Sequence, residues 1–269
     1  LAELASRFGD NLLDATQAWT LHLSDSTRLG GLPPMALEAA QQAALDRGLE
    51  GYLFTLDFPS YHAVMTHADD RELRREVYEA YNTRASDQGP CAQRFDNSEL
   101  ITEILTLRQE MAAILGFGNY AEYALATRMA TSPAQVLDFL RELARRSRSM
   151  AERELLELHA FARELGVSDF SAWDVSYHAE KLRQRTFAIS QEELRPYFPA
   201  DTVLNGLFQV IEKLFGVTLV RETTVPLYHP EARCYRLLRK GQPVAAIYLD
   251  LHARENKRGG AWMANYAVR

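Results

Sequence analysis

The chain has 269 residues, 47% of them hydrophobic and 25% charged, which is an ordinary composition for a globular protein of one or two domains. Its 30 basic and 36 acidic side chains give a net charge of −6, so the charge gives no reason to expect nucleic acid or an anionic membrane as a partner. No apolar run reaches the roughly 18 residues of a membrane span, and the two cysteines, Cys91 and Cys234, suit a reducing compartment, so we expect a cytoplasmic protein.

Helical periodicity dominates the first 216 residues, where apolar side chains recur three or four positions apart. One short strand is predicted within this region, over residues 52–56, and a turn at Asp57-Phe58-Pro59 follows it. The predicted helices cover residues 1–24, 34–48, 61–67, 69–81, 97–115, 119–129, 133–165, 171–189 and 201–215.

Several of these helices have typical terminal residues. Asp69 and Asp70 begin one of them, and Ser132-Pro133 combines an N-cap serine with a proline in the first turn of the longest helix. Gly216 closes the last helix. Arg84 lies at a helix end, and we expect its guanidinium to tie that terminus to a neighbouring carboxylate.

The periodicity changes after residue 216. Strands are predicted over residues 217–222, 234–239, 244–251 and 260–268, with a hairpin turn at Lys240-Gly241-Gln242-Pro243. The expected fold class is therefore mainly α, a long helical array followed by a small, incomplete β-sheet near the C-terminus. We divide the chain into a helical region, 1–216, and a β-rich segment, 217–269.

Metal and nucleophile motifs are missing from the sequence. None of the seven histidines is followed by Glu and by a second His four positions on, which is the helical zinc-peptidase signature. Asp250 and His252 alternate on a predicted strand and resemble a ligand pair, but a plain surface or core histidine is the simpler interpretation. There is no Gly-Xaa-Ser-Xaa-Gly elbow and no phosphate loop. We therefore assign no catalytic residue and no metal ligand, and expect no cofactor in this segment.

Two places in the chain could still contribute to function. Gly260 and Ala261 have small side chains on a predicted edge strand, where an extended peptide could add to the sheet through main-chain hydrogen bonds, so we assign them to substrate binding. A simple turn between strands is the alternative for this segment. His178 and Glu180, close together on one helix, could act as an acid and a base if both faced a pocket, or could form ordinary polar contacts.

Four segments together resemble the thimet-oligopeptidase-like zinc metallopeptidases. The likeness extends over nearly the whole chain, in order, and the combination is far more specific than any one segment. The segments are residues 51–61, residues 74–81 with 84–87, residues 115–123, and residues 248–254 with 257–261.

The resemblance implies a mostly helical, two-lobed peptidase with a deep channel, which cuts short peptides in the cytoplasm. In that family two histidines of a His-Glu-Xaa-Xaa-His helix and a downstream Glu hold zinc, and the Glu of the motif polarises the zinc-bound water. All of these residues lie C-terminal to the segment that matches Gly260 and Ala261, so none can be assigned in this sequence. The resemblance also implies that Gly260 and Ala261 border the channel.

Both ends of the sequence suggest an internal piece of a longer enzyme. The chain opens on Leu1 within a helical pattern, and its last predicted strand reaches Arg269 without a partner. We expect this piece to supply a channel wall and to be inactive alone, with zinc present only in the intact enzyme. A free-standing helical scaffold or protein-interaction module is the alternative function.

Overall fold

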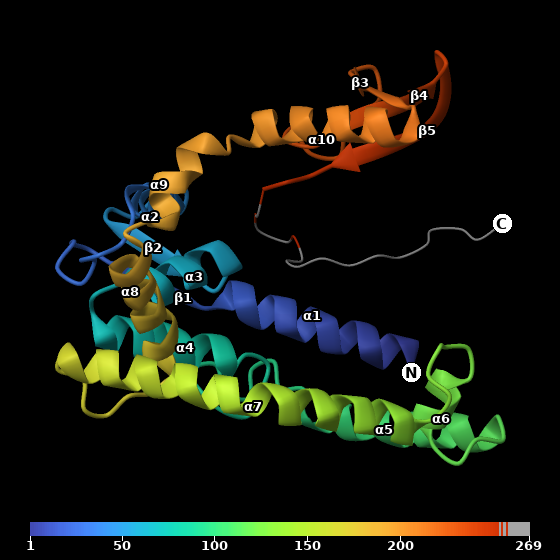
Figure 1. Ribbon diagram of the computed structural model, residues 1–269, viewed down its shortest axis with the longest axis horizontal. Coiled ribbons are helices and arrows are strands. Elements are labelled where there is room, and N and C mark those ends of the chain that lie inside the picture. Colours follow the sequence, from blue (N-terminus) through green and yellow to red (C-terminus); the bar gives the residue numbers. More distant parts are fainter. Residues whose placement is uncertain (253, 255–256, 258–269) are drawn as a thin grey trace. The chain divides into compact units, whose positions relative to one another are not determined.

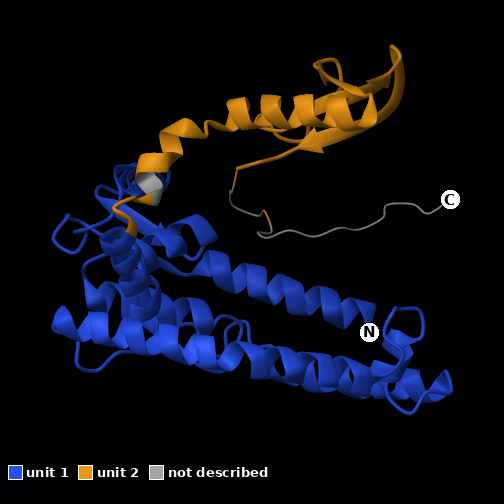
Figure 2. Cartoon of the chain, in the orientation of Figure 1, with its two compact units in different colours: residues 1–186, 258–269 blue, residues 187–257 orange. Residues whose placement is uncertain are grey.

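A computed structural model describes residues 1–252, 254 and 257 of the chain (Figure 1). The described residues form two compact units, Leu1–Thr186 and Phe187–Lys257, coloured blue and orange in Figure 2. Most described residues are helical, and the strands form small antiparallel sheets, which confirms the mainly α fold class. Within the described part of the chain, no helix has the combined length and apolarity of a membrane span.

Unit 1 contains helices and one two-stranded ribbon. The ribbon consists of β1 (Thr20–Leu23) and β2 (Tyr52–Thr55), paired antiparallel with Thr20 opposite Thr55. The helical elements of the unit are α1 (Ala2–Ala18), α2 (Pro34–Leu45), α3 (Phe58–His67), α4 (Arg71–Asn82), α5 (Ser98–Ile114), α6 (Tyr120–Leu125), α7 (Pro133–Glu164), the 3-10 turn η1 (Ala172–Asp174) and α8 (Val175–Phe187).

The predicted helix over residues 1–24 is wrong at its C-terminal end, where β1 replaces helix. The side chains of Leu21 and Leu23 pack against the buried core, and their backbone pairs with β2. Core packing and strand pairing therefore both favour a strand here. The core around them is formed by the loop before α2 and by α2, β2, α3 and α4. Its buried residues are Leu29, Leu32, Ala40, Phe54, Leu56, Val64, Ala68, Leu73, Val77 and Ala80.

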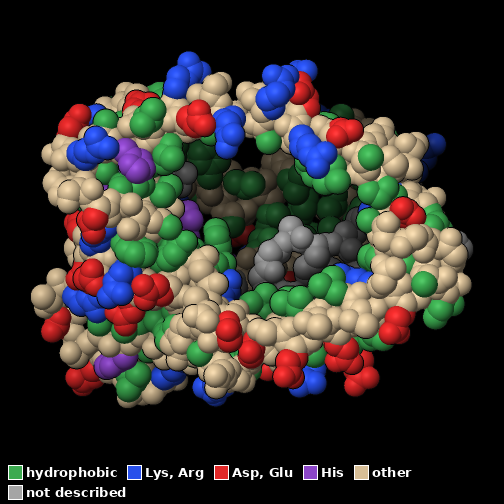
Figure 3. Space-filling view, turned by 90° about the horizontal axis from the view of Figure 1, so that it is seen from below, with side chains coloured by type: hydrophobic (Ala, Val, Ile, Leu, Met, Phe, Trp, Pro, Cys, Tyr) green, Lys and Arg blue, Asp and Glu red, His purple; other side chains and the backbone are tan. Residues whose placement is uncertain are grey.

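Two predicted helix starts are confirmed by side-chain caps. The Asp70 carboxylate accepts a hydrogen bond from the backbone N–H of Leu73 at 2.7 Å and begins α4. The Ser132 hydroxyl accepts from the N–H of Gln135 at 3.2 Å and begins α7, the longest helix. Acidic and basic side chains are interspersed over the face shown in Figure 3. Along α7, ion pairs join residues one helical turn apart.

The helix predicted over residues 171–189 starts later than expected. Ser171 and Asp174 form a capping box around the 3-10 turn η1, and the regular helix α8 begins only at Val175. This arrangement buries Asp174 completely, and it places Asp174 where arginines of α4 can reach its carboxylate.

Unit 2 consists of a helical arm and a three-stranded antiparallel sheet of order β3-β4-β5. Gly216 ends α10 in the left-handed conformation, with φ 62°, as its position in the sequence predicts. The short elements α9 and η2 were not predicted, and the strand predicted over 260–268 lies outside the described residues. The elements of the unit are α9 (Gln191–Leu194), η2 (Arg195–Tyr197), α10 (Ala200–Phe215), β3 (Thr218–Glu222), β4 (Arg233–Arg239) and β5 (Gln242–Leu249).

The change from helices to strands falls between α10 and β3, close to the predicted position at residue 216. The two compact units divide earlier, between Thr186 and Phe187, because α10 packs on its own sheet. One such contact joins the rings of Phe208 and Tyr235, whose centroids lie 4.9 Å apart. The functional assignment of 1–216 as a channel wall and of 217–269 as the β-rich segment stays a prediction.

Candidate functional site

Gly260 and Ala261, the residues assigned to substrate binding from the sequence, lie outside the described part of the chain. Their role stays a prediction. The described residues that precede them in the sequence form a charged turn, which begins after Leu249 at the end of β5. We call this turn, with Asp250, Arg254 and Lys257, the Asp250 turn.

The carboxylate of Asp250 organises the turn. Arg254 donates to both of its oxygens, at 2.6 and 2.7 Å, and the Tyr228 hydroxyl donates to Oδ2 at 2.9 Å. The Lys257 ammonium lies 3.1 Å from Oδ1 and donates to the backbone carbonyls of Asp250 and His252, at 2.8 and 2.7 Å. A bidentate arginine and a lysine bound to two carbonyls thus hold Asp250, Arg254 and Lys257 together.

These contacts shift the ionisation of the groups in the turn. The hydrogen bond from Arg254 is the main cause that lowers the pKa of Asp250 well below its usual range, so the carboxylate is ionised at neutral pH. The same bond raises the pKa of Arg254, and the hydrogen bond to Asp250 raises the pKa of Tyr228. Asp250 and Arg254 therefore form an ion pair at neutral pH.

The suggested ligand pair of Asp250 and His252 does not form on a strand, because β5 ends at Leu249 and both residues follow it. Both oxygens of Asp250 are already bound by cationic side chains. Across residues 1–252 with 254 and 257, no three His, Cys, Asp or Glu side chains gather so that they could hold a metal ion. The donor groups in this part of the chain therefore do not fit the zinc that the family resemblance implies.

The rival site at His178 and Glu180 is not brought together by the fold. His178 is 1% exposed, and its Nδ1 lies 2.8 Å from the backbone carbonyl oxygen of Asp174. Glu180 is bound instead by Arg183, at 2.6 and 2.9 Å, and by Gln184 at 2.7 Å. His178 and Glu180 therefore bind different partners, and the ring of His178 packs among aromatic rings. Both residues form ordinary buried polar contacts.

Arg84 holds a helix terminus, but its second partner differs from the prediction. Its Nε donates to the carbonyl of Tyr81 in the last turn of α4, at 2.7 Å, as expected of a residue at a helix end. Its other hydrogen bond goes to the hydroxyl of Thr16 on α1, at 2.9 Å, where a carboxylate was expected. The guanidinium also lies 3.5 Å from the centre of the Tyr81 ring.

The structure contains a cluster that was not predicted from the sequence, which we call the Asp174 cluster. It consists of the buried carboxylate of Asp174, the buried Arg74 and the partly exposed Arg71. Arg74 donates to Oδ1 of Asp174 at 2.9 Å, and Arg71 donates to both oxygens at 2.8 to 3.1 Å. The backbone N–H of Ser171 donates to Oδ2 at 3.0 Å. Only the capping box of Ser171 and Asp174 is visible in the sequence, because the arginines lie about 100 residues away along the chain.

Burial and hydrogen bonding oppose each other in the Asp174 cluster. Burial raises the pKa of Asp174, but hydrogen bonds from Arg71 and Arg74 outweigh it, so the pKa lies below its ordinary value. The hydrogen bond to Asp174 likewise raises the pKa of Arg71. The carboxylate and both guanidinium groups have their partners within the fold, which is the arrangement of a structural ion cluster joining α4 to η1.

The comparisons with known proteins identify the family. Residues 64–269 match the model of Peptidase family M3. The chain is 50% identical over 265 residues to oligopeptidase A from Salmonella typhimurium and from Escherichia coli, and 32% identical over 269 residues to dipeptidyl carboxypeptidase from Escherichia coli. Each alignment covers 98% of this chain but only 39% of the relative.

The family model matches most of the chain, and the relatives align along nearly all of it. Both findings agree with the family that the four segments of the sequence resemble. The chain belongs to peptidase family M3.

Proposed function

We propose that residues 1–269 are part of a zinc-dependent oligopeptidase that hydrolyses short peptides. The observation that carries the proposal is the 50% identity over 265 residues with bacterial proteins named oligopeptidase A. The chain spans 39% of the length of those relatives, so the activity is proposed for the whole polypeptide. In this proposal the zinc is held by residues outside 1–269, and the enzyme works on peptides in the cytoplasm.

The role proposed for this segment is to form a wall of the substrate channel and to contact the peptide backbone at Gly260 and Ala261. Long helices such as α7 are stiff elements that can restrict the size of a substrate. The sequence supports the assignment at Gly260, because Gly260 and Ala261 have small side chains on a predicted edge strand. Small side chains allow close approach of an extended peptide.

The first experiment compares two purified proteins, residues 1–269 alone and the full-length gene product. The full-length protein is expected to bind zinc and to cleave a quenched fluorescent peptide in a chelator-sensitive manner, and residues 1–269 alone are expected to do neither. Chelator-sensitive cleavage by residues 1–269 would overturn the proposal that this segment is inactive without the rest of the protein. An open reading frame that stops at Arg269 would instead support the helical scaffold.

The second experiment tests the peptide contact in the full-length protein. Gly260→Pro removes a backbone N–H, whereas the matched control Gly260→Ala keeps it. If the N–H binds the substrate backbone, Gly260→Pro raises KM for a short peptide at least several-fold more than Gly260→Ala, with equal zinc content in both variants. Equal KM values for the two variants would show that the backbone N–H of Gly260 does not bind the substrate.

A further inference from the structure

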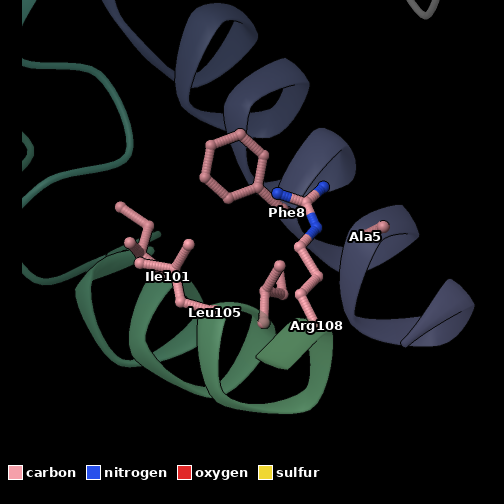
Figure 4. A pocket seen from close by; sticks show the side chains of 6 residues that line it. Ala5, Phe8, Ile101, Leu105 and Arg108 are labelled. Carbon is pink, nitrogen blue, oxygen red and sulfur yellow. The ribbon is translucent and has the colours of Figure 1, made fainter. Parts of the chain in front are cut away.

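A pocket of about 280 Å³ lies between α1 and α5 in unit 1 (Figure 4). Its wall is almost entirely apolar, with one cationic side chain. The lining residues are Ala5, Phe8, Ile101, Ile104, Leu105 and Arg108. None of them belongs to the Asp250 turn or to the Asp174 cluster.

Arg108 is the unusual member of the wall. Figure 4 shows its side chain reaching from α5 toward α1. Its Nε is buried and has no hydrogen-bond partner among the residues that the structure describes, although its guanidinium lies 5.1 Å from the centre of the Tyr120 ring. Arg108 as a whole is partly exposed, but a buried N–H without an acceptor is costly, so the site favours an occupant that brings an acceptor, and a carboxylate is the strongest one for a guanidinium.

The pocket wall is itself partly exposed, and the exposed apolar surface extends to Leu12, one helical turn beyond Phe8 on α1. Leu105 is 57% exposed, Ile101 47% and Leu12, on α1, 38%. Exposed apolar side chains that adjoin an apolar pocket are typical of a surface that another element covers. A volume of about 280 Å³ is enough for one or two side chains of a polypeptide.

We propose that this pocket docks a polypeptide segment that presents an apolar side chain and a neighbouring Asp or Glu, supplied by the part of the M3 peptidase outside residues 1–269. The apolar side chain fills the space between Phe8 and Leu105, and the carboxylate binds Arg108. The relatives supply the reason to look within the same polypeptide, because 1–269 corresponds to only 39% of their length. The inference concerns assembly of the enzyme and does not depend on its substrate.

The test places the photo-crosslinking residue p-benzoylphenylalanine at position 105 of the full-length gene product. Irradiation followed by mass spectrometry is expected to join this position to a segment outside residues 1–269 that contains Asp or Glu. The matched control carries the same residue in place of Glu110, an exposed residue of the same helix on a face away from the pocket, and is expected to lose this crosslink at least tenfold. Position 101 serves as a second probe site if the variant at 105 does not fold.

A charge reversal tests the role of Arg108. In the probe variant, Arg108→Glu is expected to reduce the yield of the crosslink at least fivefold, because it places two carboxylates side by side. Arg141→Glu, a reversal at an exposed position of α7, is the control and is expected to leave the yield unchanged. Crosslinks confined to residues 1–269, crosslinks between two copies of the protein, or a yield that Arg108→Glu does not change would each overturn the proposal.

Discussion

The guanidinium of Arg74 donates to Oδ1 of Asp174 at 2.9 Å, and the two side chains are only 2% and 0% exposed. The pair joins α4 to η1 across 100 residues of sequence. Arg74 also donates to the backbone carbonyl of Ala68 at 2.7 Å and to that of Trp173 at 3.2 Å. One buried arginine on α4 thus binds the residue after α3 and the backbone of η1. Because both charges are out of water, each depends on the other for its stability.

Replacing Asp174 by Asn is therefore expected to destabilise the protein strongly. The substitution keeps the size of the side chain but leaves the buried charge of Arg74 without its counter-ion. Removing one partner of a buried ion pair costs about 3 to 5 kcal/mol of unfolding free energy. Equilibrium denaturation in urea, followed by circular dichroism, measures the loss.

The matched control is Glu72→Gln, which breaks an ion pair with Arg75 on the same helix. That pair is exposed, with side chains 64% and 43% accessible, so its loss is expected to cost less than about 1 kcal/mol. Similar losses for Asp174→Asn and Glu72→Gln would show that burial does not set the strength of the Asp174 pair.

The same pair predicts how stability depends on pH. Burial raises the pKa of Asp174, but the hydrogen bonds from Arg71 and Arg74 outweigh it and leave the pKa below the ordinary value of 3.8. A carboxyl group with a lowered pKa in the folded state contributes stability that is complete above its unfolded pKa and is lost as the pH falls through the folded value. The difference in unfolding free energy between the natural protein and Asp174→Asn is therefore expected to be constant from pH 7 to 5 and to shrink below pH 4. Urea titrations at pH 7, 5 and 3 test this, and a constant difference would contradict it.

The parts of the fold that the sequence predicts are those whose causes are local. Asp70 and Ser132 cap helices through bonds to residues three positions away, and Gly216 ends α10 through its own backbone conformation. The strand β1 was predicted as helix, because its conformation is set by pairing with β2 and by the core. Periodicity within a single segment carries no information about such a partner.

The candidate site follows the same division. The capping box of Ser171 and Asp174 is a local pattern that the sequence contains, but its arginine partners come from another helix. The Asp250 turn is local as well, with Arg254 four residues and Lys257 seven residues from the carboxylate. Asp250 was nevertheless predicted on the strand over residues 244–251, which ends at Leu249 in the structure. The hydrogen bond from Tyr228 depends on the fold of unit 2.

Gly31 is expected to tolerate no side chain. Its φ is 82°, and a Cβ atom there would overlap the backbone carbonyl oxygen of His67 and lie 2.7 Å from Oδ1 of Asp69. Gly31→Ala therefore combines a strained backbone with a steric clash and is expected to cost more than about 2 kcal/mol of unfolding free energy. Gly48→Ala is the control, because Gly48 has a φ of 69° and open space around the same position, so only the backbone strain of about 1 to 2 kcal/mol applies. Thermal and urea denaturation of both variants separates the two causes. Equal losses of unfolding free energy in the two variants would show that the steric clash does not contribute.

The turn between β4 and β5 offers a stabilising substitution. Arg239 pairs with Gln242, so Lys240 and Gly241 form a two-residue hairpin loop, with φ of 51° and 75°. Two positive φ values are typical of a type I′ turn, in which Asn followed by Gly is the preferred sequence. Lys240→Asn is therefore expected to raise the stability of unit 2 by about 0.5 to 1 kcal/mol, because Asn adopts the left-handed conformation more readily than Lys. Hydrogen exchange of the amides in β4 and β5 reports on this hairpin directly and is expected to slow in the variant.

Lys240→Val is the opposing control, since a β-branched side chain disfavours positive φ and is expected to accelerate exchange at the same amides.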